Sequence, residues 1–200
     1  MSGEFRDLFQ LPEGIVYLDG NSLGPLPVSV PVALQRVAQD EWGKLAIGGW
    51  NRAGWMAQPS DLGDDIARLI GAPAGSVVTG DTLSIKVYQA LATALSLQTD
   101  RRIVLSDNGN FPTDLYMAEG LLRSLDKGHE LRVVDPEAVL NSITDDTAVV
   151  MLTQVDYRTG RMHDMAAITA AAHAQGAMVI WDLAHSAGAV PGHLEDCAAD

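Results

Sequence analysis

The chain has 200 residues, of which 47% are hydrophobic and 20% charged, a composition typical of a globular protein with one sizeable core. With 26 Asp plus Glu against 13 Lys plus Arg, the formal net charge is -13, which disfavours partners such as nucleic acid or an anionic membrane surface. The single cysteine, Cys197, excludes an internal disulfide framework, and the charged first residues do not resemble a signal peptide. Because no apolar run approaches membrane-spanning length, we expect a cytoplasmic protein.

Residues 1–45 are predicted to form an N-terminal arm and a helix, and residues 46–200 a larger domain. After an arm over residues 1–14, a short strand is expected at residues 15–18. It leads into DGNSLGP, whose glycines, asparagine and proline are typical of a tight turn.

A helix is predicted from Pro31 to about Trp42, with Gly43 as its end. The glycine-rich loop that follows carries Trp50 and Trp55. Two tryptophans in one loop need a surface to pack on, which is the core, a second subunit or a flat ligand.

From residue 60 onward, apolar runs of strand length alternate with helical patterns after a first helix that ends at Gly71. The predicted strands are 77–79, 103–105, 131–134, 148–152 and 177–181, and the predicted helices between them are 82–97, 113–125, 136–143 and 165–175. This alternation predicts the α/β class, with a mainly parallel sheet between two helical layers in a three-layer α/β/α arrangement.

Polar residues follow these strands, and the carboxyl ends of parallel strands meet at one edge of a sheet, where ligands bind. Thr82 and Ser84 begin a helix, whose N-terminal N–H groups suit a phosphate. Phe111 offers a flat ring, and Asp182 offers a carboxylate directly after a buried strand. Together they describe a phosphorylated, cationic aromatic ring such as pyridoxal phosphate. Each also has a simpler interpretation, as helix caps or as core packing.

Three motifs in this order resemble the kynureninase family: DGNSLGPLP from residue 19, FPTD from residue 111 and WDLAHSAGAVP from residue 181. The resemblance extends from about Tyr17 to Asp200. It implies a pyridoxal-phosphate transferase-like large domain of the aspartate-aminotransferase fold type, and a homodimer. It also implies hydrolysis of kynurenine to anthranilate and alanine, in tryptophan catabolism and NAD biosynthesis, with pyridoxal phosphate as cofactor.

The resemblance also implies which residues hold the cofactor. Asp182 would be catalytic, because a carboxylate beside the ring nitrogen keeps it protonated and strengthens the cofactor as an electron sink. The implied cofactor-binding set is Leu83 and Ser84 at the phosphate, Phe111 on the ring, Thr153 near the phenolic oxygen, and Pro112, Thr113, Asp114, Asp182 and His185.

Substrate-pocket candidates lie in the N-terminal part: Asn21, Ser22 and Trp50. An aromatic residue at position 50 resembles the bacterial type of the family, which favours kynurenine over 3-hydroxykynurenine. Packing in the core or at an interface is the alternative for Trp50.

The family's lysine that binds the cofactor covalently lies further along than Asp200. None of Lys44, Lys86 and Lys127 has its sequence context. The resemblance therefore implies that this chain corresponds to about the first half of the enzyme, and we expect no native turnover from it alone.

Other interpretations remain open. Cysteine desulfurases share the strand-end aspartate and histidine, but they place a histidine where Phe111 stands and lack DGNSLG. A non-catalytic fragment or scaffold is a further alternative. AHSAG, with Ser186 at its centre, approaches the nucleophile elbow of hydrolases but begins with alanine. A metal site from Asp182, His185 and His193 matches no familiar ligand spacing.

Overall fold

The computed structural model describes residues 5–200. The chain divides into two compact units, Met1–Pro59 and Ser60–Asp200. This division by contacts falls later than the expected boundary after residue 45, and that boundary stays a prediction. Residues 1–4 of the expected arm lie outside the described residues.

The first unit begins with a two-stranded ribbon. After the 3-10 turn η1 (Arg6–Leu8), β1 (Phe9–Gln10) pairs antiparallel with β2 (Leu26–Pro27). Residues 15–18 form no strand, so that prediction is wrong, because this segment has no neighbouring strand to pair with. Instead, the hydroxyl of Tyr17 donates hydrogen bonds to the carbonyls of Asp19 and Leu23, which close the predicted turn.

A chain of short helices completes this unit: α1 (Val30–Arg36), the π-helix η2 (Val37–Trp42), α2 (Gly43–Leu45), the 3-10 turn η3 (Ala46–Gly48) and α3 (Gly49–Arg52). The prediction that Gly43 ends the helix is wrong. Its φ of -61° is helical, and the direction changes at Ala46, whose φ is 46°.

The two tryptophans of the loop pack on each other within this unit. Their ring centroids lie 6.2 Å apart in a T-shaped arrangement, and Trp55 Nε1 donates to Glu41 Oε2 at 2.9 Å. A Cβ at Gly49 would lie only 2.6 Å from the ring of Trp55, so the close packing requires glycine.

The first unit has almost no buried interior. Gly49 is the only buried residue of residues 5–59, whereas Val16, Leu18 and Ile47 are 82%, 89% and 81% exposed. Apolar side chains exposed to this extent are typical of a surface that another surface covers.

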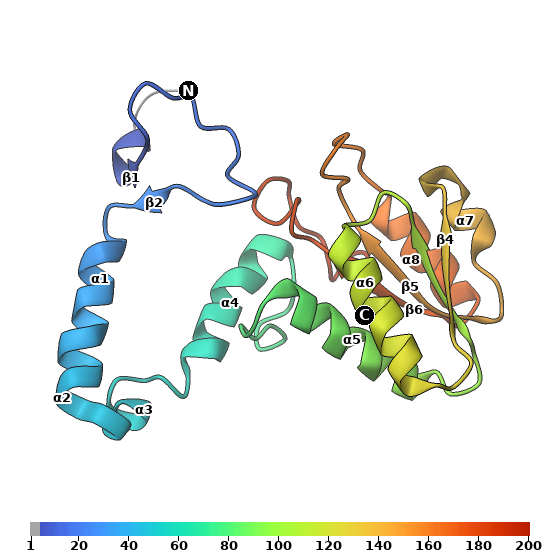
Figure 1. Ribbon diagram of the computed structural model, residues 1–200, viewed down its shortest axis with the longest axis horizontal. Coiled ribbons are helices and arrows are strands. Elements are labelled where there is room, and N and C mark those ends of the chain that lie inside the picture. Colours follow the sequence, from blue (N-terminus) through green and yellow to red (C-terminus); the bar gives the residue numbers. More distant parts are fainter. Residues whose placement is uncertain (1–4) are drawn as a thin grey trace. The chain divides into compact units, whose positions relative to one another are not determined.

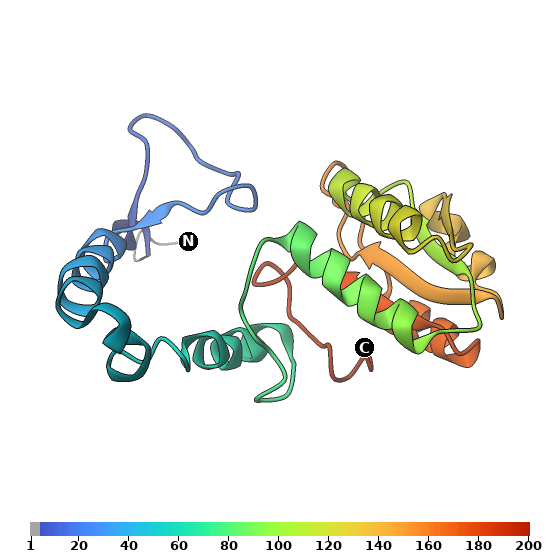
Figure 2. The same ribbon diagram turned by 60° about the horizontal axis from the view of Figure 1, so that its bottom comes forward.

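The second unit is a parallel sheet with helices on both faces (Figures 1 and 2). Its strand order is β4 (Glu130–Val134), β3 (Ile103–Asp107), β5 (Thr147–Thr153) and β6 (Met178–Asp182). All three strand pairs are parallel. The helices of this unit are α4 (Gln58–Ile70), α5 (Leu83–Leu97), α6 (Pro112–Leu125), α7 (Val139–Ser142), which follows the turn η4 (Pro136–Ala138), and α8 (Met165–Ala174). The predicted α/β class with a mainly parallel sheet is confirmed.

Two apolar cores lie on opposite faces of this sheet. Because successive side chains of a strand point to opposite faces, Met151 packs under α5 and α6, whereas Val150 and Leu152 pack against α7 and α8. Leu91 of α5 and Val179 of β6 are fully buried. Four of the five strands expected from apolar runs in this unit therefore form the middle layer.

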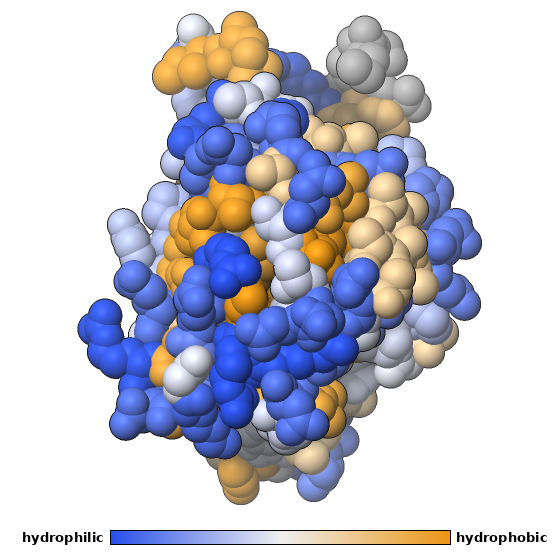
Figure 3. Space-filling view, turned by 90° about the vertical axis from the view of Figure 1, so that its right-hand side faces the viewer, coloured by the Kyte–Doolittle hydropathy of each residue, from blue (hydrophilic) through white to orange (hydrophobic). Residues whose placement is uncertain are grey.

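Two details of the sheet differ from expectation. Residues 77–79 form no strand, since they have no strand partner among the described residues. The expected full burial of β6 is also wrong: as an edge strand it is only partly buried, and Val133 of the opposite edge strand β4 is 43% exposed. Figure 3 views the right-hand side of Figure 1, where apolar patches lie between hydrophilic side chains.

The helix α4 confirms the predicted element, but its large apolar side chains are not buried. Leu62 and Leu69 are 45% and 62% exposed, and the buried residues of α4 are Gly63 and Ala67. A Cβ at Gly63 would lie 2.0 Å from the Val77 carbonyl oxygen, so this helix approaches backbone through its glycine. Within residues 5–200 no helix has the length and apolar character to span a membrane.

We expect Gly63→Ala to destabilise the fold by about 2 kcal/mol, because the new methyl group overlaps backbone that cannot move aside easily. The matched control is Gly120→Ala in α6, where a Cβ meets nothing within 4 Å. It should stabilise by about 0.5–1 kcal/mol through helix propensity. Urea unfolding of both variants measures the difference, and equal midpoints would contradict the close approach.

Candidate functional site

A chain of hydrogen bonds joins the carboxyl ends of three neighbouring strands. The amide of Asn110 donates to Ser106 Oγ at 2.9 Å, and the hydroxyl of Thr153 donates to Asn110 Oδ1 at 2.5 Å. The same hydroxyl lies 3.1 Å from Asp182 Oδ2, and Asp182 Oδ1 accepts from the Ala184 N–H at 2.7 Å. Thr153 and Asp182 are register partners on β5 and β6. The network therefore fixes the Asp182 carboxylate at this edge.

A second carboxylate, that of Asp114, lies close to Asp182 in the first turn of α6. It is fully buried, and neither oxygen has a hydrogen-bond partner among the described residues. Burial, and after it the nearby carboxylate of Asp182, together raise the pKa of Asp114 from 3.8 to about 7. Two buried carboxyl groups without a cation between them suit a ligand that brings a protonated nitrogen.

Three rings pack together beside this pair. The centroid of Phe111 lies 5.1 Å from that of Tyr157 and 5.9 Å from that of His185. His185 Nδ1 lies 2.9 Å from the carbonyl oxygen of Val155, so Nδ1 is the nitrogen that donates. Rings held in this way offer an apolar surface to a flat ligand.

The structure brings five of the proposed cofactor residues to the ends of the neighbouring strands β5 and β6 and the start of α6: Phe111, Asp114, Thr153, Asp182 and His185. Pro112 and Thr113 share the first turn of α6, and Leu83 and Ser84 lie in the first turn of α5, after Thr82 as its N-cap. The side chain of Ser84 is partly buried. Their roles remain predictions.

The substrate-pocket candidates Asn21, Ser22 and Trp50 belong to the first unit, where Ser22 Oγ donates to Asp19 Oδ1 at 2.7 Å. Their surroundings are described within that unit only, and their role in a substrate pocket stays a prediction.

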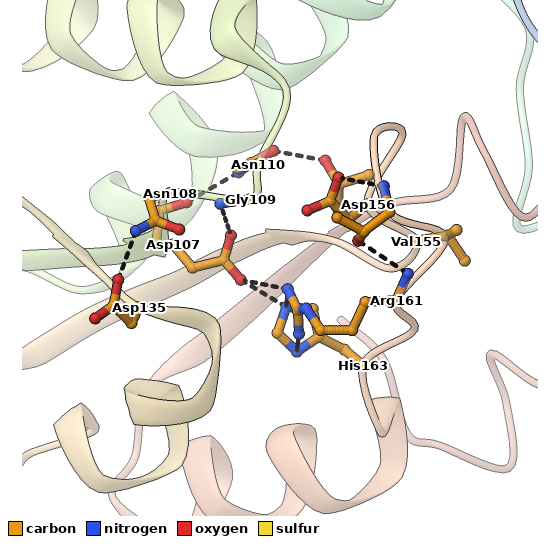
Figure 4. A network of polar contacts seen from close by, with 12 residues as sticks. Asp107, Asn108, Gly109, Asn110, Asp135, Val155, Asp156, Arg161 and His163 are labelled. Atoms are coloured by element: carbon orange, nitrogen blue, oxygen red, sulfur yellow. Dashed lines mark hydrogen bonds and ion pairs between the residues drawn. The ribbon is translucent and has the colours of Figure 1, made fainter.

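Sequence reasoning missed Asn110 and Tyr157. Asn110 directly precedes Phe111, and Tyr157 follows β5 in a loop. Both therefore lie after the carboxyl end of a strand, and this position is the signal that could have marked them as candidates. It also missed the pair of Asp107 and His163, which Figure 4 shows next to Gly109 and Arg161. Asp107 and His163 are 56 residues apart in the sequence, so no local sequence pattern indicates that they pair.

The hydrolase interpretation does not fit the geometry. Ser186 is 2% exposed and its hydroxyl is directed to the Leu183 carbonyl at 3.4 Å, so it is not presented as an exposed nucleophile. AHSAG also leads into turns instead of a helix. Across residues 5–200, no group of three or more His, Cys, Asp and Glu side chains is arranged to hold a metal ion.

The raised pKa of Asp114 has a consequence for stability. Between its ordinary value of 3.8 and about 7, the folded protein retains a proton that the unfolded chain has lost. The free energy of unfolding should therefore fall as pH rises through this range, by about 2 kcal/mol after allowance for solvent screening.

Asp114→Asn should remove this dependence. Urea unfolding without added ligands, at about pH 4, 6 and 8, should show the variant gaining stability relative to the unmodified protein as pH rises. Parallel profiles would mean that Asp114 is ionised throughout and already has a partner.

Comparison with known proteins gives the family of the chain. The profile of the aminotransferase class-V family matches residues 16–200. Kynureninases of Pseudomonas fluorescens and Burkholderia pseudomallei (strain 1106a) are 52% and 49% identical to the chain, over 98% of this chain and 48% of each relative. The chain thus spans about half the length of these curated relatives.

Solved structures share the fold at low sequence identity. Cysteine desulfurases of Escherichia coli and Thermococcus onnurineus superpose with TM-scores of 0.76 and 0.75 at 19% and 20% identity, covering 99% and 98% of this chain and 52% and 51% of theirs. A mutant of C-DES with glycine covalently linked to its PLP cofactor has a TM-score of 0.73 at 18% identity, over 98% of this chain and 53% of that one. By the profile match over residues 16–200, the chain belongs to the aminotransferase class-V family.

Proposed function

We propose that this chain is part of a pyridoxal-phosphate enzyme that hydrolyses kynurenine to anthranilate and alanine. Kynureninases are 52% and 49% identical to the chain over 98% of its length, and this similarity supports kynurenine as the substrate. The observation that carries the cofactor is the buried pair of Asp114 and Asp182, one of which has no hydrogen-bond partner within residues 5–200. A protonated pyridine nitrogen supplies the positive charge that this pair lacks.

The residues of the second unit fit the remaining parts of the cofactor. The first turn of α5, with the Leu83 N–H and the Ser84 hydroxyl, would bind the phosphate, because N-terminal N–H groups carry partial positive charge. Phe111 and His185 would lie against the ring. When bound, pyridoxal phosphate supplies an electron-withdrawing ring that stabilises negative charge on the substrate's Cα.

The chain's own contribution is to hold a proton and orient the groups around it. Asp182 would keep the proton on the ring nitrogen, since a carboxylate beside a cation favours its charged form. The Ala184 N–H holds one oxygen of Asp182 at 2.7 Å, and the Thr153 hydroxyl lies 3.1 Å from the other. The three packed rings would keep water away from one side of the site.

Substrate recognition would involve the first unit. Its exposed apolar side chains and nearly absent interior support a homodimer in which Trp50, Asn21 and Ser22 line a pocket for the aniline ring. An aromatic residue at position 50 supports kynurenine over its 3-hydroxy form. We further propose a cytoplasmic hydrolase of tryptophan catabolism and NAD biosynthesis, whose cofactor-bound lysine follows this segment in the whole enzyme.

Cysteine desulfurase activity is the weaker candidate. The two desulfurase structures described above are 19% and 20% identical to the chain, which supports only the fold.

We expect Asp182→Asn to lower the turnover of kynurenine by about 100-fold or more while changing pyridoxal-phosphate affinity less than about tenfold. The reason is that an amide does not hold the ring nitrogen protonated. Anthranilate fluorescence measures turnover, and the visible absorbance band measures cofactor binding, in the protein as the cell makes it.

The control is Asp196→Asn, because the side chain of Asp196 is 84% exposed. It should match the unmodified protein in both assays. If the unmodified protein binds the cofactor but releases no anthranilate, kynurenine is not its substrate. If it does not bind pyridoxal phosphate, the proposed cofactor is wrong and a non-catalytic scaffold is favoured.

A further inference from the structure

The loop of residues 154–163, here called the Tyr157 loop, connects β5 to α8 and closes on itself. Val155 and Met162 form an antiparallel bridge, and the His163 N–H donates to the Gln154 carbonyl at 2.9 Å. Inside the loop, the buried carboxylate of Asp156 accepts from the Arg158 N–H at 2.8 Å. These contacts give the loop a defined shape.

A buried pair fastens this loop to the end of β3 (Figure 4). Asp107 is 1% exposed and His163 is 6% exposed, and His163 Nε2 lies 2.6 Å from Asp107 Oδ2. The other oxygen of Asp107 accepts from the Gly109 N–H at 2.8 Å. Arg161 lies 3.3 Å from His163 Nδ1 and 3.4 Å from Asp107 Oδ2. A hydrogen bond to a buried carboxylate is stronger than a neutral one, so this pair is a firm anchor.

The loop reaches both residues that flank the proposed cofactor ring. Its Val155 carbonyl accepts from His185 Nδ1, and the ring of Tyr157 lies against Phe111 and His185, at 5.1 and 5.9 Å between centroids. The side chain of Tyr157 is nevertheless 48% exposed, with the guanidinium of Arg158 over its ring at 5.5 Å. A ring anchored to this degree and still exposed keeps area for a further flat partner.

We propose that Tyr157 is a further aromatic binding residue, which contacts the ring of the bound cofactor or its adduct with substrate beside Phe111 and His185. Asp107 and His163 are positioning residues that hold its loop in place. This inference rests on the proposed function, because it takes the flat ligand beside the three rings to be the bound cofactor.

The first experiment compares Tyr157→Ala with Tyr157→Phe in the protein as the cell makes it, by titration with pyridoxal phosphate. Tyr157→Ala should weaken cofactor affinity about tenfold and reduce the visible circular dichroism of the bound cofactor, because one ring contact is lost. Tyr157→Phe should retain both signals, since the ring remains. The control is Tyr116→Ala, whose side chain is 65% exposed on α6, and which should have no effect.

The outcomes separate the two proposals. Cofactor binding and dichroism unchanged by Tyr157→Ala would overturn the role of Tyr157 and leave the proposed function standing. No binding by the unmodified protein would overturn both.

The second experiment tests the positioning residues without cofactor, by amide hydrogen exchange. His163→Gln and Asp107→Asn should raise exchange in residues 154–163 about tenfold or more while β5 stays protected. The control is His173→Gln. It removes the pairing of His173 with Asp200, which lies outside residues 154–163, and should leave exchange in the loop unchanged. Unchanged exchange in either variant, or loss of protection throughout β5 in both, would overturn a local positioning role.

Discussion

The site depends on two carboxyl groups that are buried beside each other. Bringing Asp114 and Asp182 out of water is unfavourable unless a proton or a cation lies between them, and the protein supplies hydrogen bonds to only one of the two. The raised pKa of Asp114, about 7, is a consequence of this: near neutral pH and without a ligand, Asp114 carries a proton in about half of the molecules. Under the proposed function, a ligand with its own N–H cation would replace that proton, so the electrostatic arrangement would favour a charged nitrogen.

The parallel sheet is what makes this arrangement possible. Thr153 and Asp182 are register partners, so their side chains share one face at the strand ends, and the crossover after β3 starts α6 with Asp114 in its first turn. Apolar residues fill both faces of the sheet below this level, in the two cores. The polar residues are thus concentrated at the edge where the strands stop, and the packed layers prevent them from moving apart.

Much of this was predictable from the sequence because apolar runs and strand-end motifs are local signals. The runs that became β3, β4, β5 and β6 were identified. Phe111 and Asp182 were candidates because they follow strands, and Asp114 was a candidate through the family resemblance alone. Residues 15–18 and 77–79 have the same local pattern but form no strand, because strand formation requires a partner. Asn110, Tyr157 and the pairing of Asp107 with His163 were missed since their contacts join distant segments. The exposed leucines of α4 show the converse: an apolar face does not itself specify what covers it.

The two units contribute differently to function. Residues 60–200 contain both apolar cores and the complete carboxylate and aromatic arrangement, so cofactor recognition follows from the folding of one unit. Residues 5–59 bury only Gly49, and their Trp50 is 46% exposed. A pocket wall needs a surface facing it, and this unit does not provide one from its own residues. Under the proposed function, substrate preference would depend on a surface that faces this unit, whereas cofactor binding would depend on the fold of the sheet.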